Sequence, residues 1–356
     1  MTDTWTWATV TQATPLRIKV DGDTSALDAT TDNLVGSLAV DDRVRVHLHS
    51  DGIIVTGLQG GGTPEATAAT PNTLALRDGD GQLKAADGVA ADDVATVAQL
   101  PNPNLLINSD FMVNQRGVVS GATIAPYTYF LDRWYSPSPS TRTHTWANVG
   151  GVRTLTLSGG TIRQTVEQAN LPAGTYTLSW DGTTVASVYN AGGANPAGAS
   201  SPLTVVLDGT DDVQIDLAGV GAAIKNVKFE QGTVATPYQP PTYADNLRAC
   251  MRYYQRFGGE TPYQRFGLGF AISTTQARIQ IPFMTPMRVS PTVTWGTLGV
   301  RINSGIDTAT NITVQAPSTT LGYLTVTVAS GLTSGAAMEL LADGSSDGFV
   351  AFDSEL

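Results

Sequence analysis

Residues 152–157 read VRTLTL and residues 175–180 read TYTLSW, two runs in which large apolar side chains alternate with polar ones. Leu155 and Leu157 alternate with threonines, and Leu178 and Trp180 alternate with Thr177 and Ser179. Alternation with a period of two is typical of a β-strand that buries one face. We therefore expect a strand at each run.

Runs of this kind recur every eight to twelve residues and are separated by Gly, Pro and Asp turns. The further candidates lie at residues 161–166, 185–189, 203–207, 213–217 and 224–229. Short strands at this spacing are typical of a two-sheet β-sandwich, which we predict for residues 105–240. We expect Phe130 and Trp134 to be buried in its core.

Residues 1–60 predict a smaller β domain. Alternating runs occupy residues 5–10, 16–20 and 43–49, and an Asp-Gly turn leads into a fourth run at 53–55. In the third run Val44, Val46 and Leu48 are expected to face inward. Four short strands in about 60 residues favour an OB-like or SH3-like barrel.

Residues 61–104 are rich in Ala, Thr and Asp and contain too few large apolar residues to build a core. A segment of this kind is either a linker or a stalk that buries its apolar side chains against identical copies. We favour the stalk, which predicts an oligomer.

Residues 241–356 predict one helix followed by strands. Five apolar residues between 243 and 257 fall on one helical stripe: Tyr243, Leu247, Cys250, Met251 and Tyr254. Cys250 is expected to pack as a small buried hydrophobe. Strand candidates then follow at residues 268–272, 278–283, 292–295, 324–328 and 349–352, so we expect the C-terminus to be tied into a sheet. The fold class is therefore mainly β.

The composition excludes several functions. Only 14% of residues are charged, against roughly 25% in ordinary domains, and 20 basic side chains oppose 31 acidic ones. Without clustered Lys and Arg we expect no nucleic-acid partner. No apolar run approaches about 18 residues, so we expect no membrane insertion.

The sequence contains no motif that is diagnostic of a catalytic or metal site. No nucleophile motif accompanies His144, and neither Asp110 nor Asp132 has a partner at a spacing typical of a glycosidase pair. His47 and His49 share one strand face, which suits either a metal or a solvated barrel surface. The solvated surface is favoured, and we predict no catalytic residue, no cofactor and no metal.

Aromatic residues are the best candidates for ligand binding. Tyr127, Tyr135 and Trp146 are flanked by turn residues and could present flat ring faces to a sugar, with Arg142 and Asn148 as polar partners. Packing in the sandwich core is the alternative for each aromatic.

Several segments resemble bacteriophage tail-fibre proteins. Residues 104–111 (NLLINSDF), 114–117 (NQRG), 129–134 (YFLDRW) and 227–238 (VKFEQGTVATPY) are similar to the carbohydrate-binding-module-like jelly roll of these fibres. The helix region 246–254 and the C-terminal segments 281–293 and 352–356 also resemble this family. Residues 70–78 and 91–96 are similar to fibre shafts, and residues 1–60 are similar to the small barrel of minor tail proteins.

The resemblance implies a non-enzymatic, homotrimeric receptor-binding protein of the virion tail. Residues 1–60 would attach to other tail proteins, residues 61–104 would form the shaft, and residues 241–356 would form a trimeric tip. The ligand would be a host cell-wall or capsular glycan. Asn226 stands where related jelly rolls carry a calcium-binding carboxylate, so no metal is implied. A tail-associated polysaccharide depolymerase and a purely structural tail component remain the alternatives.

Overall fold

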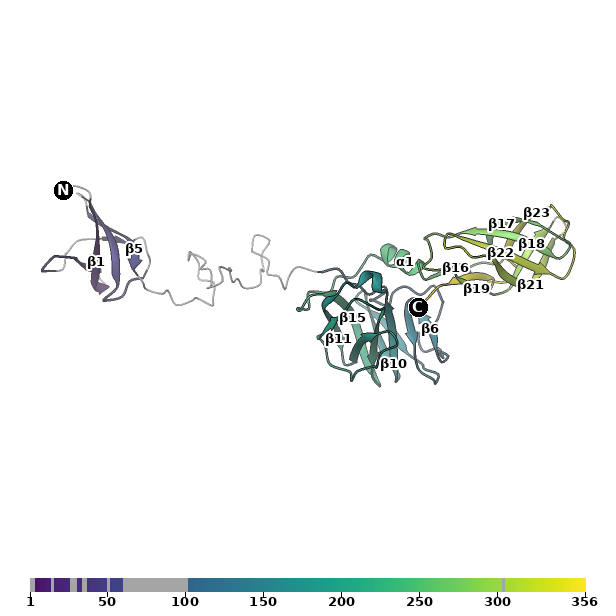
Figure 1. Ribbon diagram of the computed structural model, residues 1–356, viewed down its shortest axis with the longest axis horizontal. Coiled ribbons are helices and arrows are strands. Elements are labelled where there is room, and N and C mark those ends of the chain that lie inside the picture. The colour runs from purple at the N-terminus through teal and green to yellow at the C-terminus, as the bar shows by residue number, and fades with distance from the viewer. Residues whose placement is uncertain are drawn as a thin grey trace. The chain divides into compact units, whose positions relative to one another are not determined.

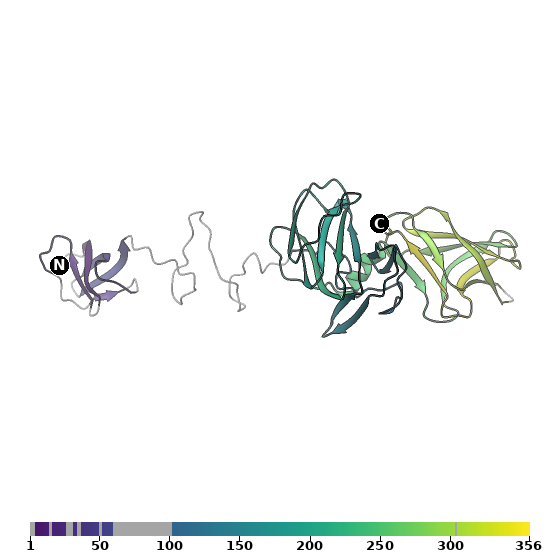
Figure 2. The same cartoon turned by 90° about the horizontal axis from the view of Figure 1, so that it is seen from below.

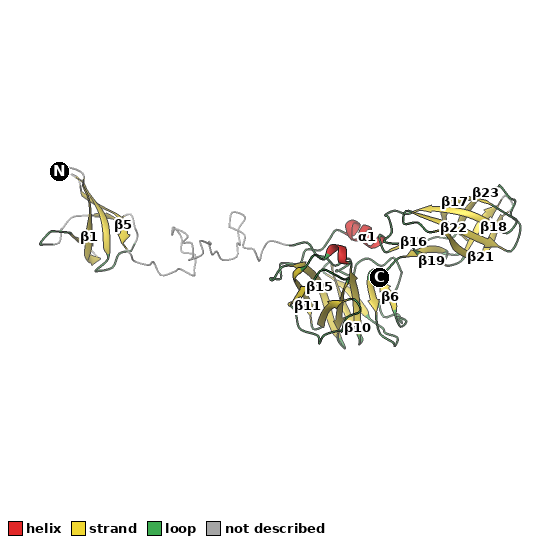
Figure 3. Ribbon diagram, in the orientation of Figure 1, coloured by secondary structure: helices red, strands yellow, loops and turns green. Residues whose placement is uncertain are grey.

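The computed structural model is mainly β, and the helices are short (Figure 3). It describes residues 4–13, 16–25, 31–33, 37–49, 52–59, 102–302 and 305–356. The chain divides into two compact units, residues 1–96 and 97–356. The predicted stalk, residues 61–104, lies outside the described residues except for 102–104.

The N-terminal unit contains a five-stranded sheet in the order β2-β1-β4-β5-β3. Two of its strands, β1 and β5, are labelled in Figure 1. Its strands are β1 (Thr4–Ala13), β2 (Leu16–Val20), β3 (Thr31–Asn33), β4 (Arg43–His49) and β5 (Gly52–Gln59). Val44 and Val46 are buried in its core and Leu48 packs against it, as the alternation predicts. In the described part of this unit, β2 and β3 are the outer strands of the sheet.

Residues 128–231 form two five-stranded sheets (Figures 1 and 2). The first has the order β12-β14-β10-β7-β6, made of β12 (Val185–Asn190), β14 (Val213–Ala218), β10 (Thr161–Val166), β7 (Trp134–Ser136) and β6 (Thr128–Leu131). The second has the order β13-β11-β15-β9-β8, made of β13 (Leu203–Leu207), β11 (Gly174–Gly182), β15 (Ala222–Gln231), β9 (Val152–Leu157) and β8 (Thr145–Val149).

One hydrophobic core joins both sheets, so they form a sandwich. Ile162 and Ile215 come from the first sheet, whereas Leu155 and Phe229 come from the second, and all are fully buried. Phe130 and Trp134 are buried in the same core, which confirms that expectation. Consecutive strands from β9 to β15 alternate between the two sheets. The strands β6, β7 and β8 are not among those predicted, because they are short and lack a regular alternation of large apolar and polar residues.

The C-terminal part has its own core within the second unit. A closed barrel has the strand order β17-β18-β22-β21-β20-β23, with β17 (Arg265–Ala271), β18 (Gln276–Pro282), β22 (Leu321–Val328), β21 (Gly305–Ala316), β20 (Leu298–Ile302) and β23 (Ala337–Ala342). A three-stranded sheet beside it consists of β16 (Tyr254–Gly258), β24 (Phe349–Asp353) and β19 (Thr292–Trp295). The C-terminus is thus tied into a sheet, as expected.

The predicted helix is too long and its stripe is partly wrong. The helix α1 spans Tyr243–Met251, and the chain then turns into β16 at Tyr254. Tyr243 is 57% exposed, while Asn246 and Cys250 are the buried residues of the helix. Tyr254 is buried even though it lies on a strand, and the Arg116 guanidinium lies 3.9 Å from the centre of its ring. Within the described part of the chain, no helix has the length and apolar character needed to cross a bilayer.

Buried polar residues join the sandwich to α1 and the C-terminal sheet. Asn108 holds the segment before β6, because its Nδ2 donates to the carbonyls of Val113 (2.8 Å) and Asp132 (2.9 Å). Its backbone N–H donates to Asn246 Oδ1 of α1 (2.8 Å). Glu355 binds both Arg116 (Nη2 to Oε1, 3.2 Å) and Arg133. The segment before β6, α1 and the C-terminal Glu355 therefore meet at this junction, and these contacts stabilise the fold.

Candidate functional site

A row of side chains crosses the first sheet of the sandwich on the face away from the core. The cross-strand pairings place its members in one register: Tyr129, Tyr135, Arg163, Asp216 and Ser187. Each is followed or preceded by a core residue, such as Ile162 before Arg163, so the alternation of the strands directs the row outward. We call these five residues the polar row.

The centre of the polar row is a bidentate ion pair. Arg163 Nε donates to Asp216 Oδ1 (2.6 Å) and Nη2 donates to Oδ2 (2.8 Å). Tyr189, two residues after Ser187 on β12, donates its hydroxyl to Asp216 Oδ2 (2.9 Å) and accepts from Arg163 Nη2 (2.6 Å). Burial and the neighbouring Asp216 carboxylate raise the pKa of Tyr189 to about 12, so it remains a neutral hydroxyl.

A loop closes one end of the row. This loop follows β12 and contacts it through an antiparallel β-bridge, in which Ala186 and Ala199 exchange two backbone hydrogen bonds. Asn195 of this loop donates Nδ2 to Asp216 Oδ2 (3.0 Å) and accepts from the Ser187 hydroxyl (2.6 Å). The hollow between loop and sheet has a volume of about 120 Å³. At roughly 30 Å³ per water molecule, it holds only a few waters and accepts the edge of a ligand but not a whole drug-sized molecule.

Aromatic rings continue the row at its other end. Tyr135 is half-buried on β7, and its ring lies 5.0 Å from that of Tyr129. Tyr129 is fixed, because its hydroxyl donates to the Leu356 carbonyl (2.5 Å) and the Arg116 guanidinium lies 5.2 Å from its ring. Tyr135 is therefore the aromatic surface beside Arg163. A sugar ring can pack its C–H face on such a surface while its hydroxyls bind nearby polar groups.

The structure does not bring the five predicted binding residues into one site. Tyr135 lies on the polar row, whereas Trp146 and Asn148 lie on β8 in the opposite sheet. Tyr127 is 59% exposed in the turn before β6. Arg142 lies in the connection between β7 and β8, and its backbone pairs with that of Ile124, which precedes β6.

Two of these residues already have structural partners. Trp146 is partly buried and packs against the sandwich core, which agrees with the packing alternative. Asn148 Oδ1 accepts from Arg153 Nε (2.9 Å). None of the predicted site residues is Arg163, Asp216, Tyr189, Asn195 or Ser187. Their only signal was that they occupy polar positions in or beside the predicted strands.

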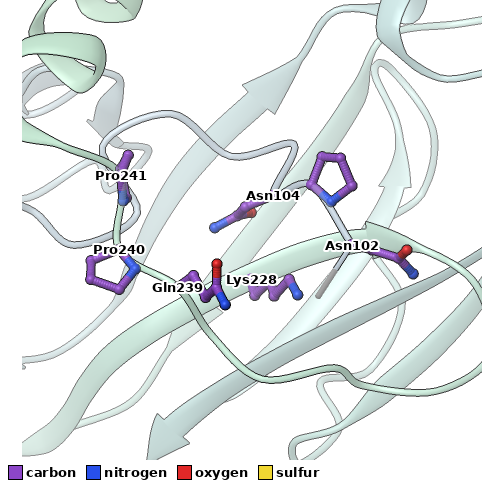
Figure 4. Close-up of a pocket in the computed structure, with 7 residues that line it drawn as sticks. Asn102, Asn104, Lys228, Gln239, Pro240 and Pro241 are labelled. Atoms are coloured by element: carbon purple, nitrogen blue, oxygen red, sulfur yellow. The ribbon is translucent and has the colours of Figure 1, made fainter. Parts of the chain in front are cut away.

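A larger hollow lies where the chain enters and leaves the sandwich, with a volume of about 350 Å³ (Figure 4). Its lining residues are Asn102, Pro103, Asn104, Lys228, Gln239, Pro240 and Pro241. Lys228 Nζ donates to Thr236 Oγ1 and forms an ion pair with Glu230 (3.2 Å). Asn104 Oδ1 accepts from the backbone N–H groups of Leu106 (3.1 Å) and Phe229 (3.0 Å). The lining residues of this hollow include no aromatic ring, whereas the polar row carries the half-buried Tyr135. We therefore favour the polar row as the binding site.

The residues considered for catalysis and for metal binding also have local partners. Asp132 accepts from Gln115 N (2.6 Å) and Nε2 (2.7 Å), and Asp110 accepts from Asn246 Nδ2 (2.8 Å). Asn226 donates to Asp181 Oδ2 (2.8 Å). Over the described ranges, no group of three or more His, Cys, Asp or Glu could hold a metal ion. His47 stacks on Trp5, and the side chain of His49 lies outside the described residues.

His144 predicts a pH-dependent stability. It is buried, and its Nδ1 accepts from Ser158 N (3.2 Å). Burial and, second, the nearby Arg142 charge lower its pKa from 6.5 to about 4. Between these pH values His144 therefore binds a proton in the unfolded chain but not in the folded chain. The free energy of unfolding consequently decreases as the pH falls from 6.5 to 4.

We expect His144→Asn, whose amide oxygen can still accept from Ser158, to remove this dependence. Asp132 has the opposite slope, because burial raises its pKa to about 6. The test is therefore the difference between the free energies of unfolding of wild type and variant, measured by urea titration from pH 7 to pH 4. A difference that is constant over this range would contradict the assignment.

No family model matches the chain, and no curated protein matches it with significance.

Proposed function

We propose that the protein is a bacteriophage tail-fibre or receptor-binding protein that attaches the virion to a host cell-surface polysaccharide. The observation that carries the proposal is the polar row, which places an aromatic ring, a bidentate ion pair and a hydroxyl side by side on the outer face of the sandwich. These are the groups that recognise a sugar through stacking and hydrogen bonds. The resemblance of residues 104–134 and 227–238 to tail-fibre jelly rolls supports it independently.

The electrostatics of the row favour a neutral sugar. The Arg163 guanidinium and the Asp216 carboxylate neutralise each other, so the row offers no unpaired charge to a uronic acid or a phosphate. The Asp216 carboxylate is 3% exposed and accepts from Arg163, Tyr189 and Asn195. The row therefore offers a ligand the Tyr135 ring and the partly exposed, charge-paired Arg163 guanidinium. We therefore propose a neutral hexose or deoxyhexose unit of the polysaccharide as the ligand.

A hollow of about 120 Å³ predicts weak binding at each site. A millimolar Kd corresponds to a binding free energy of about 4 kcal/mol, which is too small for lasting adhesion through one subunit. Three linked copies increase the overall affinity by about 10²–10⁴. The homotrimer, the stalk and the trimeric tip therefore belong to this proposal.

The proposed architecture is that of a fibre. The alternation of β9 to β15 between two sheets supports a jelly roll. The pairing of β1 with both β2 and β4, together with the parallel pair β3–β5, supports an OB-like barrel in the N-terminal unit. This unit would attach the fibre to other tail proteins of the virion.

Two tyrosines provide a matched test. We expect Tyr135→Ala to weaken binding to purified host polysaccharide about tenfold, which corresponds to ~1.4 kcal/mol, because the stacking surface is lost. Tyr243→Ala removes an equally large, 57% exposed ring on α1, outside the sheet that carries the row, and should leave binding within about twofold. A glycan array identifies the sugar, and calorimetry with that sugar measures both variants.

Equal losses for both variants, or retention of affinity by Tyr135→Ala, would refute the polar row as the site. Binding to no host glycan would favour a purely structural tail component. Release of new reducing ends during incubation would favour the depolymerase.

A further inference from the structure

The N-terminal sheet has a second face that the glycan-binding proposal does not use. Ala8 and Val10 of β1 point into the core, so Trp5 and Trp7 point to the other side. Antiparallel pairing aligns Trp5 with His47 and Trp7 with Arg45 of β4. We call this surface the Trp-Arg face, and its members are Trp5, Trp7, Arg17, Lys19, Arg43, Arg45 and His47.

Large aromatic surface is left in water there. Trp5 is 52% exposed and Trp7 is 38% exposed, and they are two residues apart on one strand. A single exposed apolar residue is ordinary, but two adjacent tryptophans form a patch. Tryptophan and arginine are also the residues most enriched where binding energy concentrates in protein interfaces.

The charge of the face is opposite to that of the chain. Lys19, Arg43 and Arg45 lie on this face, and Arg43 pairs with the Asp21 carboxylate, whereas the whole chain has 31 acidic and 20 basic residues. Asp21 pairs with Arg43, and this hydrogen bond lowers the pKa of Asp21. The face therefore retains net positive charge and attracts an acidic partner.

Whether the tryptophan ring faces are free distinguishes two classes of acidic partner, nucleic acid and polypeptide. Single-stranded nucleic acid is held by bases that stack on free aromatic faces. Trp5 is already stacked on His47, with ring centres 4.3 Å apart and planes at 11°, and the Arg45 guanidinium lies 5.1 Å from its centre. On Trp5 this intramolecular stacking leaves mainly the ring edges for a partner, which favours a polypeptide over stacked bases.

We propose that the Trp-Arg face is a docking site for an acidic polypeptide segment that carries apolar side chains. Its carboxylates pair with Arg45 and Lys19, and its apolar side chains pack against Trp5 and Trp7. The site lies on a different compact unit from the polar row, so it can be tested independently of glycan binding.

The test uses the full chain and fluorescence anisotropy. The probe is a fluorescein-labelled peptide of alternating glutamate and leucine, and the comparison peptide has glutamine in place of glutamate. We expect saturable binding of the acidic peptide that weakens with added salt, and no binding of the glutamine peptide. Arg45→Glu and Trp7→Ala should each weaken binding by about tenfold or more. Both residues are exposed, and circular dichroism verifies the folding of the variants.

The matched control is Arg301→Glu, which makes the same change in net charge at an exposed arginine of the C-terminal barrel. We expect it to leave the affinity within about twofold. Equal weakening by Arg301→Glu and Arg45→Glu would overturn the site, as would absence of acidic-peptide binding. Tighter binding of labelled oligothymidylate than of the peptide would overturn the choice of partner in favour of nucleic acid.

Discussion

Replacing Glu355 with alanine is expected to lower the free energy of unfolding of the second unit by about 3–5 kcal/mol. The Glu355 side chain is 3% exposed and lies between two guanidinium groups. Arg133, itself 2% exposed, loses its carboxylate partner in the variant, while its contacts with the Thr165 carbonyl and the Tyr253 ring remain. A buried charge that cannot be hydrated is much more costly than a lost surface contact.

Glu339 supplies the matched control. It also pairs with two arginines, Arg265 (2.9 Å) and Arg301 (3.5 Å), but its side chain is 33% exposed. Glu339→Ala should therefore change stability by at most about 1 kcal/mol. Guanidinium chloride unfolding, followed by circular dichroism, compares the two variants. A Glu355→Ala variant as stable as Glu339→Ala would show that water reaches the junction and screens Arg133.

Replacing Trp134 with alanine is expected to destabilise the sandwich by about 3–5 kcal/mol. Its side chain is fully buried, its ring centre lies 4.9 Å from that of Phe111, and Nε1 donates to the Asn108 carbonyl (2.8 Å). The substitution leaves a cavity in the core and removes a donor from a buried carbonyl. The unsatisfied carbonyl adds to the free-energy cost of the cavity.

Trp146→Ala is the comparison for Trp134→Ala. Trp146 is only partly buried on the edge strand β8, so the surrounding structure and water can fill the space. We expect a clearly smaller decrease in the urea midpoint for Trp146→Ala. Equal decreases for the two variants would contradict the different burial of the two rings. Trp134→Phe should fall between wild type and Trp134→Ala, because it retains most of the ring volume.

The polar row could be predicted only in part. Tyr135 was selected because turn residues flank it, but nothing in the sequence indicates that Arg163 and Asp216 lie beside it. These residues are 28 and 81 positions away along the chain and meet because β7, β10 and β14 are adjacent in one sheet. Trp146 and Asn148 resemble Tyr135 in local sequence but lie in the other sheet. Local flanking residues cannot reveal which sheet a strand joins.

The Trp-Arg face shows the same limit for charge. The sequence suggested no basic cluster, because Lys19 and Arg45 are far apart along the chain and acidic residues outnumber basic ones. Pairing of β1 with β2 and β4 gathers these cations on one side of the N-terminal sheet. The surface charge of a β domain therefore depends on strand order as well as on composition.

The sequence by itself determined the mainly β class, the limits of strands such as β9, β10 and β13, and the burial of Phe130 and Trp134. These properties follow from alternation along the chain, which is a local physical signal. The tertiary structure alone decided that α1 ends at Met251, that Glu355 pairs with both Arg116 and Arg133, and which polar side chains share a face. Such features depend on the long-range pairing of strands, which buries charges together and sets register between residues that are distant in sequence.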